Sequence, residues 1–228
     1  MTPTSPATAA AAATDPAATA PTATRIAGTA AMDSAGTGPR PAPRLGPGQI
    51  DNRATYICFG LAYLLGHGAA ALSRGDDPLV GLPEWLPTTL LGIGLAIGTV
   101  YATIAALRAQ RGADQPEVLS GRLLGLAWVV AFAALFLAIT GLTATTDVPD
   151  LADMLWPAGS GLVVGLIYIA EGSVRRNLLH YSLGTWLALT SSAALLLGTP
   201  GLYLVLTVAG GGAYAVATVL EHRRLAAA

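Results

Sequence analysis

Large apolar residues gather along this chain into six blocks, each about 20 residues long or slightly longer and almost free of charged side chains. An α-helix needs ~20 apolar residues to cross ~30 Å of hydrocarbon, and helical backbone satisfies its own polar groups there. The runs are continuous rather than alternating, which argues against membrane strands. The pattern therefore predicts an all-α polytopic membrane protein with six transmembrane helices, at about 54–73, 86–107, 123–146, 154–173, 178–197 and 201–220.

Residues 1–52 have a different composition, rich in Ala, Thr, Pro and Gly and nearly without large apolar side chains. Such a segment cannot bury enough surface to offset its ordering entropy, so it is predicted to be a disordered cytoplasmic tail. It lacks the apolar stretch that a secretory signal needs after its basic start. We therefore expect a tail over 1–52 and a six-helix transmembrane domain over 53–228.

Six transmembrane helices would place the arginines unevenly on the two sides of the membrane. Eleven of the twelve lie in the tail, after the second and fourth blocks, or at the C-terminus: Arg25, Arg40, Arg44, Arg53, Arg108, Arg111, Arg122, Arg175, Arg176, Arg223 and Arg224. Arg74 alone lies on the other side, beside Asp76 and Asp77. The positive-inside rule then predicts that both termini are cytoplasmic. Trp85 and Trp156 begin the second and fourth blocks, where interfacial aromatics are expected.

Composition adds the cellular context. The chain is 53% hydrophobic and only 11% charged, whereas soluble domains carry about a quarter charged residues. Its net charge of −1 argues against a nucleic-acid partner. Every basic residue is arginine, which together with abundant Ala and Gly is typical of bacteria with GC-rich genomes. The expected location is a bacterial plasma (inner) membrane, with the lipid bilayer as the first partner.

The predicted helices can be grouped into three in-out-in hairpins. The second helix of each hairpin contains Gly-x-x-Tyr, at Gly98/Tyr101, Gly165/Tyr168 and Gly211/Tyr214. An internal triplication would relate the hairpins by an axis along the membrane normal. The three glycines would then allow close helix packing. The alternative is that apolar sequences made of Ala, Gly and Leu resemble one another without any repeat.

His67 is an ionisable residue inside the first predicted span, where such groups are costly unless they face the bundle interior, a cavity or a partner. With Thr190 and Ser191 of the fifth span it forms a candidate intramembrane polar site. A proton relay or a ligand contact is the functional interpretation. The alternatives are a neutral histidine hydrogen-bonded to a facing helix, and hydroxyls bonded back to their own helix.

A second candidate group lies at the cytoplasmic side, where Glu171 precedes Arg175 by four residues and His180 follows a short link. Glu and Arg at this spacing commonly stabilise a helix end. An interfacial salt-bridge group that sets helix depth is the structural interpretation of this charge cluster. Proton handling is the functional alternative.

Catalytic and metal-binding motifs are missing from the sequence. There is no phosphate-binding glycine loop, nucleophile elbow or HExxH motif. The single cysteine, Cys58, has no Cys/His spacing that resembles a zinc site. The sequence therefore predicts neither an enzyme nor a bound metal or cofactor.

Three segments carry a family resemblance: Gly66 to Asp77, Trp156 to Gly161, and Ala170 through His180 to Tyr181. In these the chain resembles small bacterial membrane proteins labelled ABC transporter permease, over about 53–224. That resemblance implies a separate ATP-hydrolysing subunit, because this chain has no Walker sequence. The 108–122 connection would be the segment long enough to couple to it. The chain also resembles, more faintly, acid-resistance membrane proteins built from three two-helix hairpins.

Two functions follow as hypotheses. The first is a permease-like transport component that works with partners. The second is a non-transporting stress-response or scaffold protein whose helices pack into a homo-oligomer.

Overall fold

The computed structural model describes residues 49–148 and 150–227, and these residues form helices and loops with no strand among them. The predicted tail lies almost entirely outside the described residues. The elements are α1 (Arg53–Ala62), η1 (Tyr63–His67), α2 (Gly68–Ser73), α3 (Trp85–Ala109), α4 (Gln115–Thr145), α5 (Leu151–Val174), α6 (Leu178–Ala194), η2 (Leu195–Leu197), α7 (Gly198–Val205), η3 (Leu206–Gly211) and α8 (Gly212–Ala226). The all-α prediction is confirmed.

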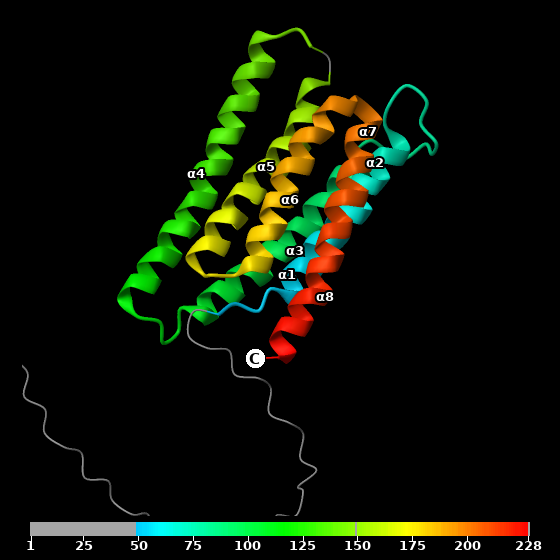
Figure 1. Cartoon of the computed structure of the whole chain (residues 1–228). Coiled ribbons are helices and arrows are strands. Elements are labelled where there is room, and N and C mark those ends of the chain that lie inside the picture. The colour runs from blue at the N-terminus through cyan, green and yellow to red at the C-terminus, as the bar shows by residue number, and fades with distance from the viewer. Residues whose placement is uncertain (1–48, 149, 228) are drawn as a thin grey trace, which may run out of the picture. The chain divides into compact units, whose positions relative to one another are not determined.

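Five helical segments of the described chain are long and apolar enough to cross a membrane: Arg53–Ser73, Trp85–Ala109, Gln115–Thr145, Leu151–Val174 and Leu178–Ala226. The fifth has 49 residues and reverses direction partway, so that α7 and α8 run back along α6 (Figure 1). The reversal lies at Gly198, with φ of +60°, and at Thr199, whose φ of −89° and ψ of 133° are not helical. The sequence predicted a helix connection at this place.

Helix α4 begins eight residues before its apolar block does. The Asp114 side chain accepts a hydrogen bond from the Glu117 backbone N–H at 2.9 Å, and Pro116 lies in the first turn. Both features favour the start of a helix, and neither requires apolar residues. The sequence predicted a connection over 108–122. This prediction is wrong in length, because α3 ends at Ala109 and α4 begins at Gln115.

The first helix and the last part of the chain pack together through π-helical turns. The π-helical segment η1 contacts the π-helical segment η3 near the middle of the bundle. There the Tyr63 ring lies against Gly210, where a Cβ would come within 2.6 Å of it. π-Helical turns inside α-helices are frequently found at functional sites. Tyr63 and His67, the first and last residues of η1, are both buried.

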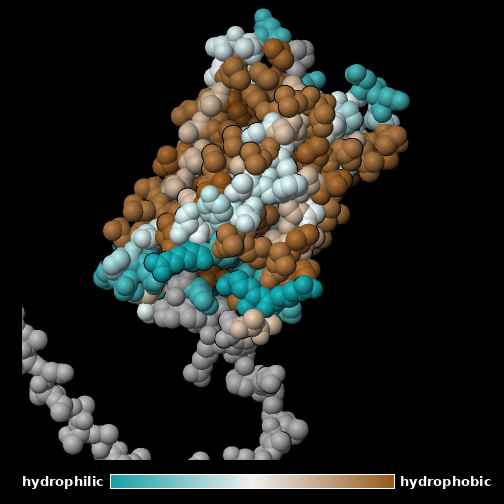
Figure 2. Space-filling model, in the orientation of Figure 1, coloured by the Kyte–Doolittle hydropathy of each residue, from teal (hydrophilic) through white to brown (hydrophobic). Residues whose placement is uncertain are grey.

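The helices differ in how much of their surface is covered. Helices α5 and α6 pack closely on each other, whereas α3 packs on α1, η1 and α2, and α4 packs on α5. As a result α3 and α4 leave most of their apolar side chains exposed. Figure 2 shows a wide apolar surface with hydrophilic residues gathered toward the two ends.

Both ends of the described chain lie at the same end of the bundle (Figure 1). The Arg224 guanidinium near the C-terminus donates to the Ile50 carbonyl oxygen at 3.0 Å. We call this the terminal end. The opposite end, which carries the connections at 74–84 and 146–150, is called the distal end.

Candidate functional site

A cavity of about 680 Å³ lies among the helices, walled by the Arg53–Ser73 segment, α3, α4 and α5 and by one residue each from α7 and α8. Small-molecule sites in proteins occupy ~300–1,000 Å³. Most of the wall is apolar, and its large side chains include Leu91, Leu95, Phe132, Trp128 and Val164. The cavity therefore has the size and character of a site for a hydrophobic molecule.

Arg74 forms the polar mouth of this cavity at the distal end. Its guanidinium makes a short ion pair with the Asp153 carboxylate and donates to the Tyr203 hydroxyl at 3.0 Å. The Tyr203 hydroxyl in turn donates to the Asp153 carbonyl oxygen at 2.8 Å. A weaker contact of 3.5 Å joins Arg74 to the Thr88 hydroxyl. Arg74 directly follows α2, so these contacts tie the end of that helix to α5 and α7.

His67 lies deeper in the same cavity. Its side chain is only 3% exposed, and it stacks edge-on against the Tyr63 ring, with 4.8 Å between ring centroids. The Tyr203 ring is 6.1 Å away on the other side. Neither imidazole nitrogen makes a hydrogen bond with a described residue. His67 is thus a buried side chain that lines the cavity and can both donate and accept a hydrogen bond there.

Ser160 is a second polar group on the cavity wall. It follows Asp153 by seven residues on α5, just as Arg74 follows His67 by seven residues on the neighbouring segment. Seven residues make nearly two helical turns, or ~10 Å, and return to the same face. On this spacing, Arg74 and Asp153 lie at the mouth, and His67 and Ser160 lie about two turns further along their own segments.

Thr190 and Ser191 do not join His67. The Thr190 hydroxyl donates to the Trp186 carbonyl oxygen at 2.7 Å, so it is bonded within its own helix. Ser191 is fully buried against α5, where a Cβ at Gly161 would come within 2.7 Å of its side chain. No hydrogen bond among the described residues connects either hydroxyl to His67. Of this candidate group, only His67 lines the cavity.

Glu171 and His180 come together near the terminal end, as the sequence expected. The Glu171 carboxylate lies 3.2 Å from His180 Nε2 and accepts the Trp128 indole N–H at 3.2 Å. The Tyr56 hydroxyl lies 2.7 Å from His180 Nδ1. With its proton on Nε2, the imidazole donates to the carboxylate and accepts from the tyrosine. Arg175 ends the helix, and its backbone N–H donates to the Glu171 carbonyl oxygen at 2.9 Å.

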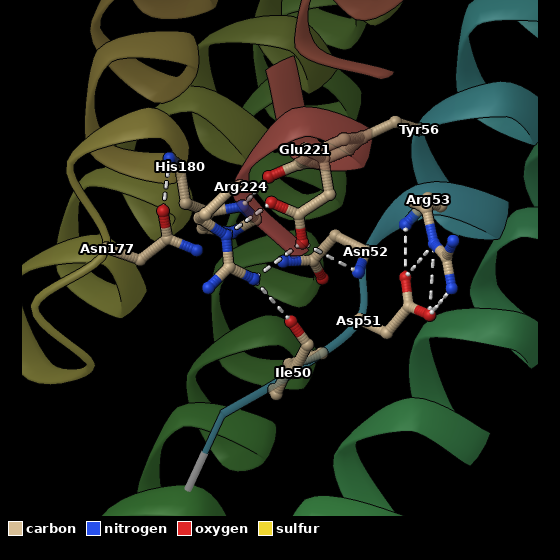
Figure 3. Close-up of polar contacts among 9 residues, drawn as sticks. All are labelled: Ile50, Asp51, Asn52, Arg53, Tyr56, Asn177, His180, Glu221 and Arg224. Atoms are coloured by element: carbon tan, nitrogen blue, oxygen red, sulfur yellow. Dashed lines mark hydrogen bonds and ion pairs between the residues drawn. The ribbon is translucent and has the colours of Figure 1, made fainter. Parts of the chain in front are cut away.

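A further carboxylate, Glu221, is fully buried beside this group (Figure 3). It accepts from Arg224 at 2.7 and 2.8 Å and from the Asn52 backbone N–H at 3.1 Å. Arg224 also holds the Ile50 carbonyl oxygen. These bonds fix the entry into α1 against α8. Nothing local in the sequence predicts that Glu221 is buried, because its burial depends on two helices that are distant along the chain.

The three glycines of the Gly-x-x-Tyr sequences all lie at close helix contacts. A Cβ would come 2.3 Å from the Phe59 ring at Gly98, 2.5 Å from the Ala188 backbone nitrogen at Gly165, and 2.8 Å from the Leu64 side chain at Gly211. Their tyrosines differ: Tyr168 and Tyr214 are 2% and 1% exposed, whereas Tyr101 is 47% exposed. The predicted repeat thus does not place this tyrosine in one shared environment.

Among the described residues, no group of three or more His, Cys, Asp or Glu side chains is placed to hold a metal ion. Comparison with protein-family models, with curated proteins and with solved structures gives no match to this chain. The likeness to permeases and to acid-resistance proteins therefore stays a prediction.

Proposed function

We infer that this chain is an integral membrane protein that crosses the bilayer six times and serves as the membrane-embedded, permease-like component of a transport system. The observation that carries this proposal is the cavity of about 680 Å³, which is apolar along its wall and polar at its distal mouth. A transport component needs such a site for its cargo, whereas a pure scaffold does not.

The placement in the membrane is supported by the exposed apolar surface and by the charges. Helices α3 and α4 expose Ile93, Val100, Val130 and Leu137, among others, each by more than half. The terminal end carries the arginines of the α3–α4 and α5–α6 connections and of the C-terminus. The positive-inside rule then assigns the terminal end to the cytoplasm. The reversal at Gly198 and Thr199 would divide Leu178–Ala226 into two spans.

The energy source would be a separate subunit, because the chain has no Walker sequence. The short α3–α4 connection at 110–114 lies at the terminal end and is a candidate contact for such a subunit.

The proposal can be tested by purifying the tagged protein in a gentle detergent and analysing by mass spectrometry both the proteins and the small molecules that co-purify. We expect a retained hydrophobic molecule and an ATP-hydrolysing protein in stoichiometric amount. A Leu95→Trp variant, which fills the cavity, should lose the small molecule. Val130→Trp is the matched control, because Val130 is 58% exposed and lies outside the cavity wall.

One observation favours the alternative of a homo-oligomeric scaffold, namely the apolar faces of α3 and α4 that other helices leave uncovered. Recovery of self-associated protein with neither a small molecule nor an ATPase would support the scaffold and overturn the transport proposal.

A further inference from the structure

We propose that the cavity binds an uncharged amphiphile with a single hydroxyl head and a long hydrocarbon or isoprenoid tail, and that His67 and Ser160 hold the hydroxyl. This inference rests on the proposed function, since it names the class of molecule that the cavity accepts. It is carried by the chemistry of the cavity wall.

His67 defines the hydrogen-bonding character of the head. A neutral imidazole offers one donor and one acceptor nitrogen, and both are without a partner among the described residues. Because His67 lines the cavity, a ligand that fills it must bond to these nitrogens or leave them without a partner, which is unfavourable. An alcohol can donate to His67 and accept from the Ser160 hydroxyl, whereas a carboxylate can only accept.

The charges at the mouth argue against an ionic head. Arg74 and Asp153 are the charged side chains on the described cavity wall, and they are paired with each other. Arg74 is also occupied by Tyr203. An anionic head at the mouth would compete with Asp153 for Arg74, and a cationic head would compete with Arg74 for Asp153. Neither would find an unpaired opposite charge on the wall, and burying an unpaired charge is costly.

The remaining wall fits the tail. Below the polar groups the cavity is bordered by Leu95 and Thr99 of α3 and by Val129 and Phe132 of α4. The Thr99 hydroxyl is bonded to the Leu95 carbonyl oxygen at 2.8 Å, so it needs no ligand. These two helices pack on different neighbours and expose their other faces. A tail that follows their inner faces would therefore lie against hydrocarbon side chains.

Intrinsic fluorescence can measure this binding. The chain has four tryptophans, and Trp128 and Trp156 line the cavity. A Trp85→Phe, Trp186→Phe background leaves only these two as reporters. The probes are a long-chain alcohol brominated in its tail, the matching brominated fatty acid at alkaline pH, and the matching brominated alkane without a head. Bromine quenches tryptophan on contact, so binding appears as saturable quenching of the purified full-length protein.

We expect the alcohol to bind at least tenfold more tightly than the acid or the alkane. His67→Leu should reduce that affinity at least tenfold, and His67→Asn should recover part of it because an amide also donates and accepts. Ser160→Ala should weaken alcohol binding without affecting the alkane. Ser192→Ala is its matched control, because the Ser192 hydroxyl is bonded to the Ala188 carbonyl oxygen at 2.8 Å and lies outside the cavity wall.

Two outcomes would overturn the inference in distinguishable ways. Saturable binding of the acid or the alkane as tight as that of the alcohol, or unchanged alcohol affinity in both His67→Leu and Ser160→Ala, would refute the hydroxyl head while leaving a ligand-binding cavity. Quenching that never saturates with any of the three probes, in protein whose helical circular dichroism is intact, would refute the inference and the proposed function together.

Discussion

The Tyr56 hydroxyl lies 2.7 Å from Nδ1 of His180, and this bond joins the first helix to α6 across 124 residues of sequence. Both side chains are buried, at 0% and 5% exposure. Because Glu171 holds the other imidazole nitrogen, the tyrosine completes the hydrogen bonding of the histidine. Three separate segments of the chain are thereby fixed at the terminal end.

Tyr56→Phe should destabilise the fold by about 1–3 kcal/mol, because it leaves a buried imidazole nitrogen without its partner. Thermal unfolding in detergent, followed by circular dichroism, would measure the loss. Tyr101→Phe is the control, since Tyr101 is 47% exposed, and it should change stability little. Equal stability of the two variants would mean that the bond contributes nothing.

Glu221→Gln should cost about 2 kcal/mol, because it removes the charge that binds Arg224 and keeps the shape of the side chain. The comparison is Asp51→Asn, which weakens the Asp51–Arg53 pair at 35% and 43% exposure. Exposed pairs contribute ~0–1 kcal/mol, so this variant should be nearly neutral. Chemical unfolding of both variants at neutral pH would rank them, and the reverse order would contradict the account of Glu221.

The Asp51 pair also predicts a small pH dependence. The hydrogen bond from Arg53 holds the pKa of the Asp51 carboxyl below its usual value. A lowered folded-state pKa contributes stability above the unfolded pKa of about 4, and that contribution is lost as the pH falls through the folded value. The difference in stability between the parent protein and Asp51→Asn should therefore shrink on acidification. A difference that grows below pH 4 would have the wrong sign.

Gly165→Ala should destabilise the α5–α6 contact by about 1–3 kcal/mol, because its Cβ would come 2.5 Å from the Ala188 backbone nitrogen and one helix must move. Gly92→Ala on α3 is the matched control, since a Cβ there meets nothing within 4 Å. The control should be neutral or slightly stabilising, because alanine favours helix by ~1 kcal/mol over glycine. Thermal unfolding of the two variants would distinguish the effect of helix packing on stability from the effect of helix propensity.

Six crossings with cytoplasmic termini predict a pattern of cysteine accessibility in a Cys58→Ala background. Asp77→Cys and Thr199→Cys, both exposed and at the distal end, should react with a membrane-impermeant maleimide in intact cells. Gln115→Cys and Ala226→Cys, at the terminal end, should react only after the membrane is broken. Protection of Thr199→Cys in intact cells would refute the division of Leu178–Ala226 into two spans.

Helix positions were the part most accessible from sequence. The first block was expected at 54–73 and the helical segment is Arg53–Ser73, because an apolar run of this length is a local property of the chain. The start of α4 was missed by eight residues, since Asp114 and Pro116 begin the helix and no apolar residue is needed there. The sequence also allowed the prediction that Glu171 and His180 lie close together, because they are nine positions apart and joined by one short connection.

Side-chain partners between distant segments were decided only by the tertiary structure. His67 was recognised as an unusual residue, but its cavity exists because α3 and α4 pack on different neighbours. Ser160 and Glu221 carry no local signal of their roles, and Tyr101 and Tyr168 share one sequence pattern yet differ in exposure. Apolar length determines where a chain can become a membrane helix. The polar side chains that face one another depend on how the helices pack, and small shifts in packing change these pairs.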